Sequence, residues 1–241
     1  MVAVVLAVTR FYRSSLKREP HEVNGYTIGP RADLAGADLA GADLAGADLV
    51  GADLAGANFR GADLREADLR EADFSGASFA GANLAGIDLR GECFHGRGRS
   101  CHAGPEHPLG VPTNFEKANL AGADLSGGVH FENGSFAEAN LRGTRFLECQ
   151  FEWVNFSGAE LAEANFADGK LRGANFTRAN LEGANLAGAD LTGANLEGAN
   201  LAGADLTGAN LKEANLSGAM ADEATIWPEG FDPEAAGVIF E

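Results

Sequence analysis

The chain has 241 residues, of which 45% are hydrophobic and 22% are charged. It carries enough apolar side chains to form a buried core, which argues against a chain that stays disordered for lack of them. Its 18 Lys and Arg stand against 35 Asp and Glu, a formal net charge of −17. Because phosphates would repel so acidic a protein, the composition excludes direct binding to nucleic acid.

The first 31 residues precede a long repetitive region, and we expect them to form a tail or cap. The apolar run Met1–Val8 is much shorter than the ~20 residues that span a bilayer. No basic residue precedes it and no clear cleavage site follows before Arg10, so it is a poor signal peptide. A membrane or export role stays open as the alternative. The 3 cysteines, an odd number, do not indicate a disulfide framework, which weakly favours the cytoplasm.

From residue 32 to 96 the chain repeats a five-residue unit of the form A-D-L-A-G without a slip. A helix would scatter the leucines around its axis, since five residues rotate a side chain by about 140°. A strand would place Leu34 and Leu39 on opposite faces. A chain that turns a corner once per repeat keeps every leucine inside, so the period predicts a solenoid.

Each position of the repeat has a physical role when the central Leu or Phe is called i. The residue at i fills the axis, and the small residue at i−2 also points inward. Asp or Asn at i−1 faces outward, where its side chain can bond to nearby backbone. Glycine is common at i+2, but Glu66, Lys117 and Glu163 also occupy that position. We therefore expect that this corner does not require a positive φ everywhere.

The repeats resume after an interruption at residues 97–112 and continue to residue 218, with Gly128 as one extra residue. The segment 97–112 contains several prolines, which bar regular ladder pairing. If it is excised, the order of the repeats continues unbroken, so we predict a loop that projects from the rod. Residues 219–241 then break the repeat although Ala221 and Ile226 keep its register, and Trp227 and Phe231 are the expected lid of the C-terminal cap.

The repeat of a small residue, Asp or Asn, Leu or Phe, any residue and Gly resembles the pentapeptide-repeat family over residues 32–218. The resemblance implies an all-β fold, a right-handed four-sided parallel β-helix of about eight to nine coils with short terminal caps. Such a rod is a single domain with a filled axis, which leaves no interior pocket, and no catalytic motif is visible. We therefore expect a non-enzymatic protein that needs no cofactor.

Acidic side chains dominate position i−1 in the first run of repeats. At a spacing of twenty residues they should stack in two columns on adjacent sides, namely Asp33, Asp53 and Asp73, and Asp48, Asp68 and Asp88. Several proteins of the family resemble a DNA duplex in width and charge, and bind type II topoisomerases. The resemblance thus implies a DNA mimic with DNA gyrase or topoisomerase IV as partner. The alternative is a generic scaffold with an unknown partner, its acidity serving solubility.

The loop 97–112 is a candidate recognition element, with Arg97 and Arg99 as contact residues. It lies among potential zinc ligands, Cys93, His95, Cys101, His102 and His107, but their spacing matches no standard structural site. We therefore expect no bound metal.

Aromatic residues fill the least regular part of the rod, residues 129–173. Phe136, Phe156 and Phe176 should stack at twenty-residue spacing, and Cys149 at i−2 is expected in the core. Trp153 faces outward from the glycine position, with Leu147 one repeat earlier, so the two form a candidate contact patch.

The C-terminal end has two interpretations. Some members of the family dimerise there, and Val238–Phe240 could serve a homodimer. The other interpretation is a monomer whose open end is simply capped.

Overall fold

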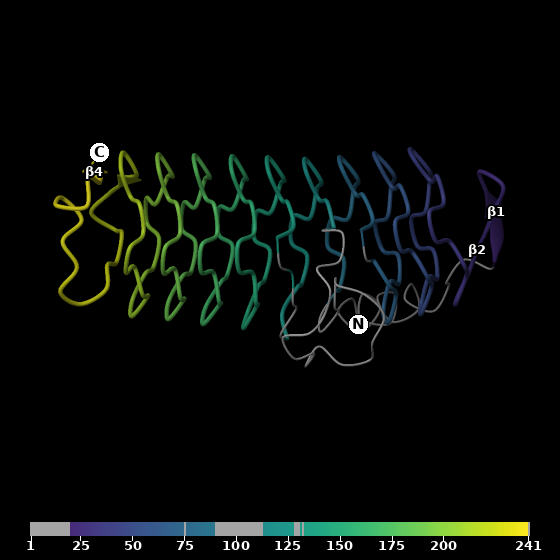
Figure 1. Ribbon diagram of the computed structural model, residues 1–241, viewed down its shortest axis with the longest axis horizontal. Helices are drawn as coiled ribbons and strands as arrows, with labels where there is room; N and C mark the ends of the chain where they lie inside the picture. Colours follow the sequence, from purple (N-terminus) through teal and green to yellow (C-terminus); the bar gives the residue numbers. More distant parts are fainter. Residues whose placement is uncertain (1–19, 75, 90–112, 128–130, 132, 241) are drawn as a thin grey trace, which may run out of the picture.

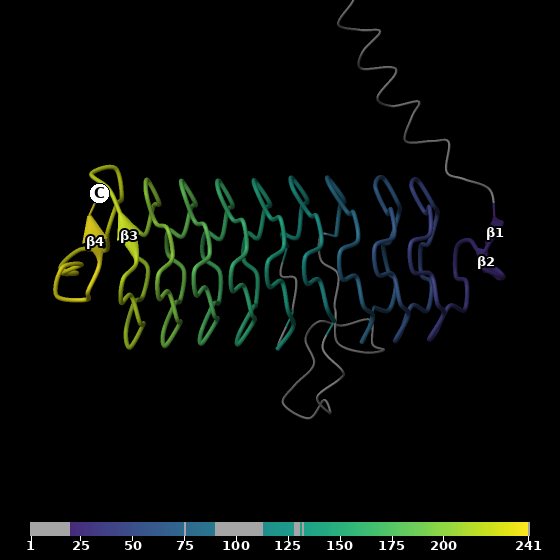
Figure 2. The same ribbon diagram turned by 90° about the horizontal axis from the view of Figure 1, so that it is seen from above.

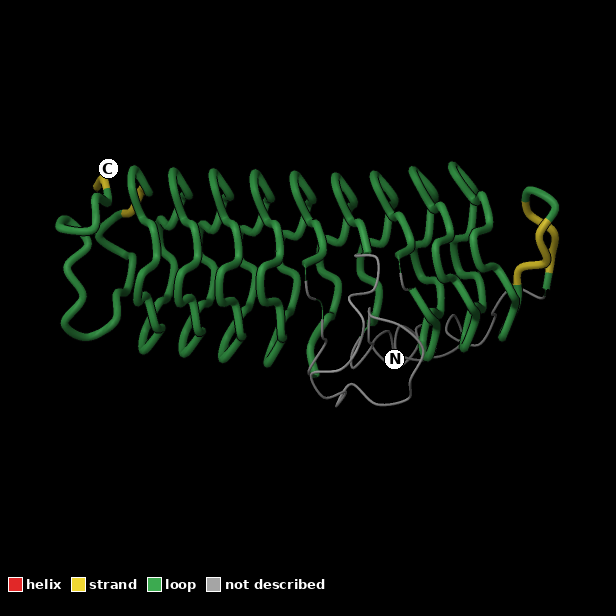
Figure 3. The backbone as a smooth tube through the Cα atoms, viewed as in Figure 1, coloured by secondary structure: helices red, strands yellow, loops and turns green. Residues whose placement is uncertain are grey.

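The computed structural model describes residues 20–74, 76–89, 113–127, 131 and 133–240. They form an elongated rod of stacked coils, with the described N-terminal residues at one end and the C-terminus at the other (Figures 1 and 2). The described residues form four short strands: β1 (His21–Val23), β2 (Tyr26–Ile28), β3 (Met220–Ala221) and β4 (Ile239–Phe240). The described part of the chain contains no helix (Figure 3).

The coils are held together by parallel bridges between residues at position i−1. Asp33 pairs with Asp53, and Asp53 with Asp73, so one coil takes twenty residues. The main-chain bonds repeat at each step, as when the Leu34 amide donates to the Asp53 carbonyl at 2.8 Å and the Asp53 amide to the Ala32 carbonyl at 2.9 Å. A β-helix can therefore be built almost wholly from isolated bridges, because each side contributes a single ladder position before the chain turns.

Four ladders define four sides of the rod, numbered here in chain order. Side 1 begins at Asp33, side 2 at Asp38, side 3 at Asp43 and side 4 at Asp48. Each residue at i+1 or i+2 is assigned to the side whose ladder residue it follows. The predicted four-sided coil is therefore present.

Two insertions lengthen the step between neighbouring coils. Ser78 pairs with Asn114, so their separation in sequence is the ordinary twenty residues plus sixteen. Asn114 pairs with Ser135, a separation one residue longer than twenty. The register therefore continues as expected across residues 97–112 and Gly128. The loop itself lies outside the described residues, so its projection from the rod stays a prediction, as does the number of coils.

The axis is filled as the repeat requires. Leu and Phe at i, and Ala at i−2, are almost completely buried along the whole described rod. The predicted aromatic stack is confirmed: the ring centroids of Phe136 and Phe156 lie 5.3 Å apart, and those of Phe156 and Phe176 lie 5.0 Å apart, with nearly parallel planes. Cys149 is fully buried at i−2, also as expected.

The expectation for the i+2 corner is wrong. Glu66, Lys117 and Glu163 have φ values of 59°, 58° and 60°, the same left-handed conformation as the glycines at equivalent corners. The turn does require a positive φ, and a side chain there costs ~1–2 kcal/mol. The presence of other residues at i+2 shows that the coil tolerates this strain.

The N-terminal end is covered by an antiparallel hairpin in which β1 pairs with β2, His21 opposite Ile28. Ile28 is buried against the first coil. The hairpin therefore closes part of the apolar cross-section of the rod, as a terminal cap of a solenoid must.

At the C-terminal end the expected register of Ile226 is wrong. Ile226 pairs with Asp205 and therefore occupies i−1, where its side chain is 52% exposed. One extra residue between Met220 and Ile226 shifts the register, so that Trp227 takes the position of the core residue. Its ring stacks on Phe231 at 5.3 Å, and both pack against the core, as expected for a lid. β4 then pairs with β3 in parallel.

Candidate interaction surface

The side chain at position i−1 bonds to the backbone and also lies at the surface of the rod. The oxygen of each Asp or Asn accepts the amide two residues further on: Ala35 donates to Asp33 at 3.4 Å, and Thr177 donates to Asn175 at 3.0 Å. Either residue type therefore closes the local turn. The turn therefore does not depend on whether the side chain at i−1 is charged.

The structure places the two predicted acidic columns on adjacent sides. Asp33, Asp53 and Asp73 lie on side 1, whereas Asp48 and Asp68 form a bridge on side 4. On side 4 the column is longer than predicted, because Asp88 pairs with Asp124. The sequence contained this signal: excision of residues 97–112 places Asp124 one coil beyond Asp88.

Arginines partly neutralise side 4. The Arg70 guanidinium donates to both carboxylate oxygens of Asp68, at 2.8 and 2.7 Å. This hydrogen bond and the charge of Asp68 raise the pKa of Arg70, and the nearby charges of Asp88 and Asp48 act in the same direction. Arg145 lies 3.9 Å from the carboxylate of Asp124. The pattern of i−1 residues did not reveal the Arg70 pair, since Arg70 lies at i+1. Arg145 is the i−1 residue that follows Asp124 in the same column, so the pattern did place that pair one coil apart.

Counted over i−1, i+1 and i+2, acids outnumber bases along the described length of sides 3 and 4. Within the repeats that end at residue 218, side 3 carries Asp43, Asp63, Glu66, Glu160, Glu163 and Glu182 against Arg65 and Arg142. Side 4 carries Asp48, Asp68, Glu71, Asp88, Asp124, Glu148, Asp168 and Asp205 against Arg70 and Arg145.

Sides 1 and 2 carry a smaller acidic excess. Side 1 carries Asp33, Asp53, Asp73, Glu152, Asp190 and Glu213 against Lys170, Arg172 and Lys212. Side 2 mixes acids with bases along its described length and carries mostly Asn and Ser at i−1. The rod therefore has an acidic pair of adjacent sides and a more balanced pair.

Trp153 faces outward at i+2, as its position predicted. Its side chain is 65% exposed, and its φ of 60° is unusual for so bulky a residue. One face of the indole lies against Gly173 of the next coil, where an added Cβ would come within 2.3 Å of the ring. Leu147 is half-buried and lies on side 4, whereas Trp153 lies on side 1. The predicted patch therefore spans two sides and has Trp153 as its main exposed element.

Several predicted features lie outside the described residues. These are Arg97, Arg99 and the Cys and His cluster around them. Among the residues that are described, no three His, Cys, Asp or Glu side chains are grouped to hold a metal ion. Burial raises the pKa of the Cys149 thiol, which disfavours the reactive thiolate there. In the described part of the chain, no helix is long and apolar enough to cross a membrane.

Exposed apolar side chains gather at the C-terminal end. Ile239 and Phe240 of β4 are 55% and 46% exposed, and Ile226 lies on the neighbouring ladder of side 4.

The model of the family described as pentapeptide repeats matches the chain in 8 copies, over residues 31–65, 57–96, 127–161, 159–198 and 189–227. The chain therefore belongs to the pentapeptide-repeat family, for which the fold is a right-handed β-helix. Among curated proteins, none matches the sequence.

Solved structures of the same kind resemble the chain in part. A pentapeptide repeat protein from the thylakoid lumen of Arabidopsis thaliana is 36% identical over 36% of this chain, which spans 61% of that protein, with a TM-score of 0.36. HetL of the cyanobacterium Nostoc, involved in heterocyst differentiation regulation, is 29% identical over 91% of this chain and 97% of its own, with a TM-score of 0.31. QnrB1, a plasmid-mediated fluoroquinolone resistance protein, is 19% identical over 80% of this chain and 91% of its own, with a TM-score of 0.36.

Proposed function

We propose that the protein is a non-enzymatic interaction rod whose acidic sides 3 and 4 dock in the DNA-binding groove of a type II topoisomerase, DNA gyrase or topoisomerase IV, and thereby modulate or protect that enzyme. The observation that carries the proposal is the excess of carboxylates on two adjacent sides of the described rod. The proposal also places the protein in the cytoplasm with its partner.

Electrostatic complementarity supports this choice of partner. Stacked coils repeat at ~4.8 Å. Side 4 therefore presents Asp48, Asp68, Asp88 and Asp124 in a closely spaced row, whereas the acids of side 3 form two groups, one near Asp43 and one near Glu160. A groove that binds duplex DNA is lined with cations for phosphates, and such a groove attracts an acidic rod of matching charge. Arg70 and Arg145 reduce the charge of side 4, but the acids still exceed the bases there.

Two matched triple variants test the proposal through inhibition of gyrase supercoiling. One replaces Asp48, Asp88 and Asp124 of side 4 by Asn, and the other replaces Asp33, Asp53 and Asp73 of side 1 by Asn. Both remove three negative charges and keep the oxygen that closes the local turn. We expect the side 4 variant to inhibit more weakly and with less dependence on salt, and the side 1 variant to change less.

Two outcomes would count against the proposal. Equal inhibition by both variants and the unmodified protein would remove the side 4 carboxylates from the mechanism. No inhibition by the unmodified protein would remove the topoisomerase as partner and leave a scaffold of unknown partner.

Trp153 favours that second candidate, a contact with a protein through an aromatic anchor. A tryptophan that is 65% exposed at a strained corner is typical of a residue that becomes buried in an interface. Capture of partners from extract by the unmodified protein but not by Trp153→Ala, with the side 4 variant as control, would assign the contact to this surface.

We also propose a homodimer through the C-terminal end. The exposed Ile239 and Phe240 on terminal strand β4 support it. The molar mass in solution at several concentrations, for the unmodified protein and for Phe240→Lys, distinguishes the dimer from a capped monomer.

A further inference from the structure

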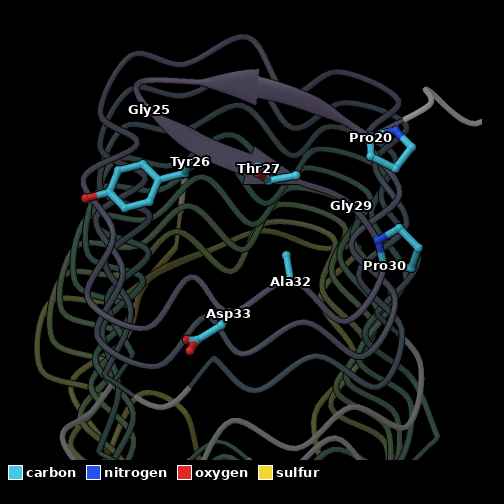
Figure 4. Close-up of a pocket in the computed structure, with 8 residues that line it drawn as sticks. All are labelled: Pro20, Gly25, Tyr26, Thr27, Gly29, Pro30, Ala32 and Asp33. Atoms are coloured by element: carbon cyan, nitrogen blue, oxygen red, sulfur yellow. The ribbon is translucent and has the colours of Figure 1, made fainter.

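The N-terminal end of the rod contains an open cavity of about 490 Å³ between the hairpin and the first coil (Figure 4). Pro20 and Pro30 line the same flank, Tyr26 lies toward the opposite flank, and Asp33 lies toward the first coil (Figure 4). Tyr26 and Thr27 of β2 form the wall opposite Ala32 (Figure 4). The cavity is thus bounded on one side by Ala32 and Asp33, where side 1 begins.

The hairpin already covers the neighbouring edge, at side 2. The hydroxyl oxygen of Tyr26 accepts the amide of Asp38 at 3.3 Å, and the side-chain amide of Asn24 donates to the Asp38 carbonyl at 3.3 Å. These two bonds replace the partners that a preceding coil would supply. The chain therefore caps this ladder with side chains where no earlier strand exists.

At side 1 the corresponding edge is open. Asp33 bridges to Asp53 on one edge, and its side chain accepts the Ala35 amide. Within the described part of the chain, its main-chain N–H and C=O have no hydrogen-bond partner. The repeat of the ladder defines what fits: a parallel strand whose carbonyl accepts the Asp33 amide and whose amide, two residues later, donates to the Asp33 carbonyl.

We propose that the cavity is filled by the N-terminal segment of the same chain, with Val2–Val8 added to side 1 as a strand. The chain before Pro20 starts at the wall of this cavity, and the eleven residues between Val8 and Pro20 can span ~36 Å, far more than the cavity requires. The run VAVVLAV is rich in β-branched residues, which suit a strand, and Pro20, Pro30 and Ala32 of the lining offer it apolar contacts. Addition of a strand to an exposed edge is a common mode of recognition.

Charge favours the same occupant. The residues that would lead from the strand to Pro20 include Arg10, Arg13, Lys17 and Arg18. The first coil beside the cavity carries Asp33, Asp38 and Asp43, all exposed. The segment therefore brings cations to an end of the rod that is lined with carboxylates. This inference is independent of the topoisomerase proposal.

Hydrogen exchange of the Asp33 amide in the full chain tests the inference. In the unmodified protein we expect this amide to exchange at least tenfold more slowly than an unprotected peptide. Val4→Asn together with Leu6→Asn should abolish the protection, whereas Ser14→Asn together with Ser15→Asn, which makes the same kind of change outside the strand, should retain it. The Asp53 amide, bonded to Ala32 at 2.9 Å, should stay protected in every variant and reports that the coils remain folded.

Three results would overturn the inference. They are an unprotected Asp33 amide in the unmodified protein, protection that survives Val4→Asn with Leu6→Asn, and protection that is lost on dilution. The last result would assign the strand to a second copy of the chain.

Discussion

The coils at the two ends of the rod share one backbone but differ in what they present at position i−1. In the N-terminal coils the position is mostly Asp, as at Asp33, Asp43 and Asp53, and in the C-terminal coils it is mostly Asn, as at Asn175 and Asn195. Both residue types close the same turn with a side-chain oxygen. The fold therefore accepts Asp or Asn at i−1, and the charge at this position can vary with function.

The two regions differ in their side-chain ladders. Asn175 donates to Asn155 at 3.2 Å and Asn215 to Asn195 at 3.1 Å, each across one coil. An ionised aspartate has no proton to donate, so a pure aspartate column cannot form this ladder and instead accumulates negative charge. The comparison indicates that the asparagine coils gain inter-coil bonds, whereas the aspartate coils carry the electrostatic surface.

The largest expected effect tests whether the two regions share one kind of core. Leu54→Lys in the aspartate coils and Leu201→Lys in the asparagine coils each place a charge in a fully buried axis. We expect both to lower the free energy of unfolding by several kcal/mol, about 3 or more, because the ammonium group would lose its water without a partner. Urea unfolding followed by circular dichroism measures this. A large loss in one region alone would show that the cores are not equivalent.

The next effect separates the strain of a corner from the packing on it. Gly173→Ala should disturb the Trp153 ring as well as the backbone, whereas Gly193→Ala, with φ of 66° and nothing within 4 Å of an added Cβ, should add only the backbone term. We expect ~1 kcal/mol for Gly193→Ala and more for Gly173→Ala. Trp fluorescence should shift in Gly173→Ala and stay unchanged in Gly193→Ala. Equal losses without a shift would mean that the added methyl group does not disturb the indole.

A smaller effect exchanges the residues that distinguish the two regions. Asn175→Asp removes the donor to Asn155 but keeps the acceptor for Thr177, so we expect a loss of ~1 kcal/mol. Asp53→Asn, the reciprocal change, should alter stability by ~0.5 kcal/mol or less, or increase it slightly. Thermal unfolding at low and high salt measures both. A substantial loss from Asp53→Asn would show that its carboxylate has a structural role.

The period of five predicted a solenoid and its buried positions, because a chain that turns once per repeat keeps Leu and Ala inside. The four-sided coil was predicted from the resemblance to the pentapeptide-repeat family. The sequence also predicted the register across both insertions, since excision of residues 97–112 restores the order of the centres. It predicted the i+2 corner wrongly. A Glu at position 66 suggests that the corner does not need a positive φ. The stacked coil nevertheless gives Glu66 the same positive φ as the glycines at i+2.

The candidate surface was less predictable than the fold. The i−1 column identifies which carboxylates stack and places Arg145 beside Asp124, but it does not include Arg70, which neutralises Asp68 from position i+1. The predicted register of Ile226 at the C-terminal end was wrong for a related reason. The period continues in sequence through Ala221, but the loop at Asp222–Thr225 takes one extra residue and is stabilised by side-chain bonds that no periodicity describes.

The smallest expected effect is confined to that loop and depends on pH. The Asp222 carboxylate accepts the Gly203 amide at 2.8 Å and the Ala224 amide at 3.0 Å, in addition to the Thr225 hydroxyl. The bond from Gly203 is the main cause that lowers the pKa of Asp222 in the folded state. Because the pKa is depressed relative to ~3.9 in the unfolded chain, the contribution to stability is present above that pH and is lost as the pH falls through the folded pKa.

We therefore expect the C-terminal cap to loosen on acidification before the coils do. In a Trp153→Phe background Trp227 is the remaining tryptophan of the 2 in the chain, and its fluorescence reports the stack on Phe231. As the pH falls below ~4, the signal should change in the parent and much less in Asp222→Asn, which has no charge to lose. Glu223→Gln, which removes the same charge from an exposed neighbour, should follow the parent. If Asp222→Asn follows it too, other carboxylates control the cap, and the register shift at Ile226 is held by packing rather than by the Asp222 carboxylate.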